Sequence, residues 1–116
     1  MIIREDLTEA FNLKPKTDIN SIKKMTPSQL DNLKVYGSAA ENLLKNKDFA
    51  LFVHHYKFDM ADELSAIKNH TAEDNCKRIS IAHMIAGVDK LVESLQRAVY
   101  LKNHAVSLQQ APIEKE

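Results

Sequence analysis

Glycine, proline and aromatic residues are all scarce in this chain. Its 116 residues include two glycines, three prolines, no tryptophan and 6% aromatic residues, whereas 44% are hydrophobic. So few turn-forming residues argue against a fold of many short strands and favour a small number of long helices. Because aromatic side chains are rare, the core has to be mainly aliphatic. The length is sufficient for one small domain.

Disulfides, net charge and long apolar runs are absent as well. The single cysteine, Cys76, cannot form a disulfide within the chain. Sixteen basic and sixteen acidic residues cancel, which argues against a general nucleic-acid coat but leaves room for a local basic patch. No stretch has the roughly 20 apolar residues of a membrane span, and the start MIIREDLTEAF is too charged for a secretory signal. We therefore expect a cytoplasmic protein that does not enter membranes.

The N-terminal part of the chain predicts two helices of unequal length. Residues 4–12 have the apolar spacing of a short amphipathic helix, and a locally basic linker follows. Thr26-Pro27-Ser28-Gln29 is a capping box with proline at the first helical position, flanked by a hydrophobic staple of Met25 and Leu30. A helix is therefore expected over 27–45. Its Gly37 costs about 1 kcal/mol relative to alanine, for which either a close helix crossing or chance would account.

The segment Asn46-Lys47-Asp48 predicts a break between two helices. The apolar stripe before it and the stripe after it would lie on nearly opposite sides of one straight helix. A turn with Asp48 as the cap of the next helix lets both stripes face one core. The alternative is a continuous helix that presents one stripe to a second subunit. We favour the break, with a helix over 48–69 whose core stripe is Phe49, Phe52, Val53, Tyr56, Met60, Leu64 and Ile67.

A long helix is expected over 71–108. Thr71 is in position to cap it, and the following Glu73 and Asp74 suit the positive end of the helix dipole. Its length would be about 50 Å at 1.5 Å per residue. The expected core stripe is Ile81, Met84, Ile85, Val88, Leu91, Val92, Leu95, Ala98 and Val99, and a thin section where another backbone could approach is formed by Ala82, Ala86 and Gly87.

These elements predict an all-α fold. Its centre is an antiparallel helical hairpin, about 48–69 and 71–108, joined by the helix 27–45 and the short helix 4–12. The corresponding division of the chain is 1–26 for the short helix and flexible linker, 27–108 for the helical-hairpin domain and 109–116 for a disordered tail.

Helix lengths predict an uncovered surface. The arm 48–69 is too short to cover the long helix beyond about Leu95, so either helix 27–45 or a second copy of the chain has to cover the remainder. Because a hairpin of this size buries a thin core, we expect a homo-oligomer. The predicted protein interface consists of Leu30, Leu33, Tyr36, Leu44, Leu95, Val99 and Val106.

No pattern in the sequence predicts catalysis or a bound cofactor. His54 and His55 diverge on a helix, and His55 with Asp59 would supply only two metal ligands. Cys76 has no identifiable base beside it. A basic stripe beginning at Lys77 and Arg78 is interrupted by acidic residues. We therefore expect a non-enzymatic protein without metal or cofactor, and leave nucleic-acid binding open.

Residues 43–109 resemble small helical-hairpin proteins of tailed bacteriophages that are encoded among head and packaging genes. The shared features are Asn46 followed by Phe49 at a helix start, the turn at His70-Thr71, the acidic pair Glu73-Asp74, and Arg78 early in the longer helix. The resemblance implies a structural or accessory head component that self-associates in virion assembly. It also implies residence in the host cytoplasm or the virion, with other virion or packaging proteins as partners.

Two other functions remain as hypotheses. The layout of short helix, linker and hairpin is also similar to some phage small terminase subunits, which form rings, although no helix-turn-helix is recognisable here. The third hypothesis is a small helical regulator that binds one host or phage protein.

Overall fold

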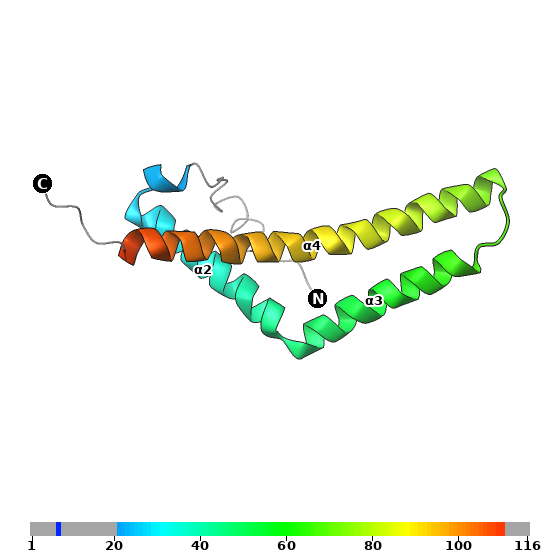
Figure 1. Cartoon of the computed structure of the whole chain (residues 1–116), viewed down its shortest axis with the longest axis horizontal. Coiled ribbons are helices and arrows are strands. Elements are labelled where there is room, and N and C mark those ends of the chain that lie inside the picture. Colours follow the sequence, from blue (N-terminus) through cyan, green and yellow to red (C-terminus); the bar gives the residue numbers. More distant parts are fainter. Residues whose placement is uncertain (1–6, 8–20, 111–116) are drawn as a thin grey trace, which may run out of the picture. The chain divides into compact units, whose positions relative to one another are not determined.

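The computed structural model describes residue 7 and residues 21–110, and every element in this part of the chain is helical. A 3-10 turn, η1 (Ile22–Lys24), is followed by α2 (Pro27–Lys45), α3 (Lys47–Ala66) and α4 (Ala72–Gln110). The predicted all-α fold with a helical hairpin is confirmed (Figure 1). The predicted helix 4–12, apart from Leu7, and the tail beyond residue 110 lie outside the described residues.

The chain divides into two compact units. One comprises residues 1–39 and 98–116 and is called the terminal unit here; the other comprises residues 40–97 and is called the hairpin unit. Helices α2 and α4 each contribute residues to both.

The start of α2 is fixed by reciprocal hydrogen bonds. The Thr26 amide donates to Oε1 of Gln29 at 2.9 Å, and the Gln29 amide donates to Oγ1 of Thr26 at 3.2 Å. Met25 and Leu30 are half-buried and pack against the same core cluster, as expected for a hydrophobic staple. The helix start predicted from the sequence is therefore confirmed in its details.

The break between α2 and α3 is confirmed, but its cap is a different residue. Asn46 has an extended backbone, and its side chain accepts a hydrogen bond from the Phe49 amide at 2.9 Å. The prediction of Asp48 as the cap was wrong, because Asp48 already lies in the first turn of α3. At that position its carboxylate interacts favourably with the helix dipole instead of with an unpaired amide.

The turn between α3 and α4 is held from the α4 side. Helix α3 ends at Ala66, three residues earlier than expected, and Thr71 Oγ1 caps α4 by accepting from the Asp74 amide at 3.1 Å. The Arg78 guanidinium donates to the backbone carbonyls of Ile67 and Asn69 and to the Asn75 side chain. Arg78 therefore supplies donors to two backbone carbonyls of the turn that follows α3, at the C-cap Ile67 and at Asn69.

The terminal unit contains the best-packed core of the described residues. Ile22, Leu33, Leu101 and Ala105 are buried together, with Leu108 packed against them. The first part of α2 therefore covers the C-terminal part of α4. Helix 27–45 of the same chain therefore covers α4 at Leu101 and Ala105, and cover of the rest of the stripe by a second copy stays a prediction.

Gly37 is the point of closest approach within the terminal unit. A Cβ atom placed there would lie 2.7 Å from the Ala98 carbonyl oxygen and would overlap the Lys102 side chain. A close helix crossing, and not chance, therefore accounts for the glycine inside α2.

The hairpin unit is a single layer of two antiparallel helices. Helix α3 and residues 72–97 of α4 run side by side, joined by the turn at 67–71 (Figure 1). In its described residues only Ala40 and Ile81 are buried, and no residue of α3 is. The two apolar stripes meet each other, but both of their edges are left exposed.

Candidate interaction surface

The predicted interface residues fall into both units and have unequal exposure. In the terminal unit Leu33 is buried in the core, Leu30 is half-buried against it, and Tyr36 is exposed. Val99 and Val106 are half-buried in that unit, and so are Leu44 and Leu95 in the hairpin unit. Leu33 is thus occupied within the chain. That the others contact a second copy stays a prediction.

Two shallow grooves mark the two faces of the hairpin unit. One is lined by the apolar residues Leu44, Phe49, Ala50, Val53 and Val92 together with His54, Lys57, Asp89 and Glu93. The other is lined by Glu63 and Ala66 of α3 with Ser80 and Met84 of α4, among others. Residues that line the same groove lie on sides of α3 and α4 that face the same direction.

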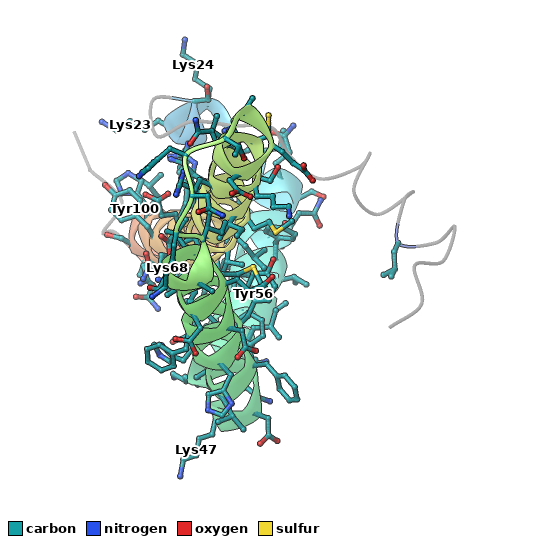
Figure 2. All side chains as sticks on the ribbon, turned by 90° about the vertical axis from the view of Figure 1, so that its right-hand side faces the viewer. Lys23, Lys24, Lys47, Tyr56, Lys68 and Tyr100 are labelled. Atoms are coloured by element: carbon teal, nitrogen blue, oxygen red, sulfur yellow. The ribbon has the colours of Figure 1, made fainter. Side chains whose placement is uncertain are left out.

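The second groove continues into a row of exposed apolar side chains. Tyr56 lies seven residues before Glu63, and Leu91 seven residues after Met84, so each shares a helix side with the groove residue. Phe52 lies one turn before Tyr56. We call Phe52, Tyr56, Met84 and Leu91 the apolar face; they are 74%, 38%, 46% and 50% exposed, respectively. Tyr56 is labelled on α3 in Figure 2.

The margins of the apolar face differ between the two helices. On α3 the exposed Asp59 and Asp62 lie along the margin, and the exposed Glu63 lies within the face, on the side of Phe52 and Tyr56. On α4 Lys77 continues the face seven residues before Met84, and the margin carries the small residues Ser80, Gly87 and Ser94. A Cβ atom at Gly87 would meet no atom within 4 Å. The thin section expected around Gly87 is therefore present, but no backbone of the described chain approaches it.

The opposite side of the hairpin unit combines apolar groove residues, among them Phe49 and Val92, with an ion pair. Lys57 Nζ lies 2.6 Å from Asp89 Oδ1, and this ion pair connects α3 to α4. Both side chains are partly exposed, so the pair contributes about 0.2–1 kcal/mol to stability and mainly fixes the register of the two helices.

A second exposed apolar pair lies on α3 alone. Leu51 and Phe58 are seven residues apart and are 47% and 65% exposed. They lie on the side of α3 that points away from the stripe facing α4. Since no comparable residues of α4 extend this pair, it is narrower than the apolar face.

The basic side chains of the hairpin unit have distinct environments. Arg78 is engaged by the turn carbonyls, and Lys90 pairs with Glu93 at 3.1 Å. Lys47 points away from the helices at the start of α3 (Figure 2). In the described residues, no group of three or more His, Cys, Asp or Glu side chains is placed to hold a metal ion. Within residues 21–110, no helix is long and apolar enough to cross a membrane.

The sequence located the residues of the apolar face but misjudged their environment. Phe52, Tyr56, Met84 and Leu91 were all expected in core stripes. The structure leaves them exposed because one partner helix covers only the centre of a stripe that is wide enough for a multi-helix core. The unusual width of the two predicted apolar stripes was the signal in the sequence that indicated this exposure.

Comparison of the chain with protein-family models, with curated proteins and with solved structures gives no match.

Proposed function

We propose that this protein is a non-enzymatic component of tailed-phage virion assembly that works by self-association. The observation that carries the proposal is the apolar face of the hairpin unit, where Phe52, Tyr56, Met84 and Leu91 are each exposed and lie on one side by their helical spacing. Contiguous exposed apolar patches of this kind are uncommon on monomeric proteins and mark interaction sites.

The thin core of the hairpin unit supports association on physical grounds. A two-helix layer buries little surface, and isolated helices of this length gain most of their stability from packing. Further helices against the apolar face would complete a bundle. The formal net charge of zero means that copies of the chain do not repel one another through their overall charge.

The roles of the shared motif residues bear on the phage part of the proposal. Asn46 and Thr71 cap helices, and Arg78 closes the turn. The features that resemble phage head and packaging proteins are thus those that build a hairpin with a long second helix. They support a common architecture, and the role in head assembly is the function we propose for it.

Light scattering of the purified chain over a range of micromolar concentrations tests self-association. The proposal predicts a mass that is a multiple of 13.2 kDa, or one that rises toward such a multiple with concentration. A mass of one chain at every concentration would overturn it. The phage part is tested by the neighbours of the coding gene: head or packaging genes support it, and an early-gene cluster contradicts it.

A further inference from the structure

We infer that the apolar face binds the same face of a second copy, with α3 of each copy lying on α4 of the other. The product is a four-helix bundle with two-fold symmetry. This inference rests on the proposed self-association and adds to it the surface, the partner and the arrangement.

The size of the face suits a small stable dimer. Helix α3 has 20 residues, which corresponds to about 30 Å of length. Two helices packed about 10 Å apart give a width of about 20 Å. The whole side of the hairpin unit that carries the apolar face therefore measures about 600 Å². Full contact between two copies would bury about 1,200 Å², the lower bound for specific interfaces.

The shapes of the two helices favour an exchanged pairing. On α3 the face carries the large side chains Phe52 and Tyr56, whereas the margin of α4 carries Ser80, Gly87 and Ser94. The empty space around Gly87 can admit an aromatic side chain or a close helix. The aromatic side chains of α3 can pack beside Met84 and Leu91 onto these small residues of α4, and a two-fold axis creates this contact twice. Pairing α3 with α3 would set bulky side chains against each other.

The charges favour the same arrangement. On α3 Glu63 lies within the face, and Asp59 and Asp62 lie at its margin. These three carboxylates take part in no ion pair within the described residues. Contact between two α3 helices would bring these carboxylates together, which is repulsive. In the exchanged pairing they lie beside the outer edge of α4, where His83 is exposed and the Lys90 side chain, which pairs with Glu93 of its own helix, is 80% exposed. With the register fixed by Lys57 and Asp89, Asp59 lies near Lys90 of the second copy.

Sedimentation equilibrium of two matched variants locates the surface. Phe52→Glu places a charge on the apolar face, and Phe58→Glu makes the same change at an exposed phenylalanine elsewhere on α3. We expect Phe52→Glu to raise the dimer dissociation constant by at least about tenfold, which is 1.4 kcal/mol, and Phe58→Glu to change it less than about twofold. Met84→Gln is the second variant on the face, and circular dichroism at high concentration verifies that each variant is helical.

Charge reversal tests the pairing of α3 with α4. Asp59→Lys and Lys90→Glu should each weaken the dimer, and the double variant should recover most of the loss because opposite charges again face each other. If Asp59→Lys strengthens association, or the double variant is no better than the single ones, the exchanged pairing is overturned.

The outcomes separate this inference from the proposed function. A wild-type chain that stays monomeric overturns both. A wild-type chain that associates and is unaffected by Phe52→Glu and Met84→Gln overturns the inference alone, as does one disrupted by Phe58→Glu to an equal or greater extent.

Discussion

Gly37 of α2 lies against Ala98 of α4 so closely that a Cβ atom at Gly37 would be 2.7 Å from the Ala98 carbonyl oxygen. Real Cβ atoms essentially never approach a backbone oxygen at this distance. The obstacle is backbone, which cannot turn aside as a flexible side chain can. The terminal unit therefore depends on the absence of a side chain at this position.

The two glycines of the chain provide a matched pair of substitutions. Gly37→Ala should destabilise the protein by about 1–3 kcal/mol because the added methyl group forces the helices apart. Gly87→Ala should stabilise it by about 1 kcal/mol, since alanine favours the helix and no atom is in its way. Urea denaturation at low protein concentration measures both, and equal effects of the same sign would contradict the two environments described.

The caps at the start of α3 can be compared in the same way. Asn46→Ala removes the acceptor of the Phe49 amide and should cost about 1 kcal/mol. Asp48→Ala removes only a favourable charge near the helix dipole and should cost about half as much. Thermal unfolding followed by circular dichroism gives both values. A larger loss of stability for Asp48→Ala than for Asn46→Ala would indicate that Asp48 is the cap, as the sequence first suggested.

Arg78 should be essential to the turn in a way that its neighbour is not. Arg78→Ala leaves the carbonyls of Ile67 and Asn69 without these donors, so we expect a loss of about 1–3 kcal/mol. Arg78→Lys should recover little of it, because an ammonium group cannot reach both carbonyls and Asn75 in the fork geometry of arginine. Lys77→Ala, on an exposed neighbour, is the control. Faster hydrogen exchange at residues 67–75 in the Arg78 variants alone would support this role, and unchanged exchange would contradict it.

The pKa of Asp31 reports on the contact between α2 and the C-terminal end of α4 within the terminal unit. The hydrogen bond from the Gln109 side chain, and then that from Lys34, hold the pKa of the Asp31 carboxyl below its ordinary value. A lowered pKa in the folded state adds stability above the ordinary pKa, and this stability is lost as the pH falls through the lowered value. In Gln109→Ala, the pKa of Asp31 measured by NMR titration should rise toward its ordinary value. An unchanged pKa would show that Gln109 does not hold the carboxylate.

The local signals in the sequence predicted local structure well. The reciprocal caps of Thr26 and Gln29 and the cap at Thr71 depend on residues three apart, so the sequence contains the whole interaction. The break at 46–48 followed from the phase of two stripes. The phase of the stripes could not decide whether Asn46 or Asp48 is the cap. Both residue types are good caps, and the cap is the one whose backbone is extended.

The hydrophobic periodicity of the sequence could not predict interactions between residues that are far apart in the chain. That Gly37 meets Ala98, or that Lys57 meets Asp89, depends on the packing of whole helices. The exposure of Phe52 and Leu91 has a similar origin. Periodicity gives the side of a helix on which a residue lies, but the number of helices that cover that side is a property of the assembled fold.

Hydrogen–deuterium exchange at low and high protein concentration tests most directly whether the apolar face is where copies of the chain meet. If it is, amides of residues 47–66 and 80–95 should exchange more slowly at the higher concentration, with the largest slowing around Phe52 and Tyr56, and much less slowing at 98–110. Identical exchange at both concentrations, or slowing confined to 98–110, would contradict the account.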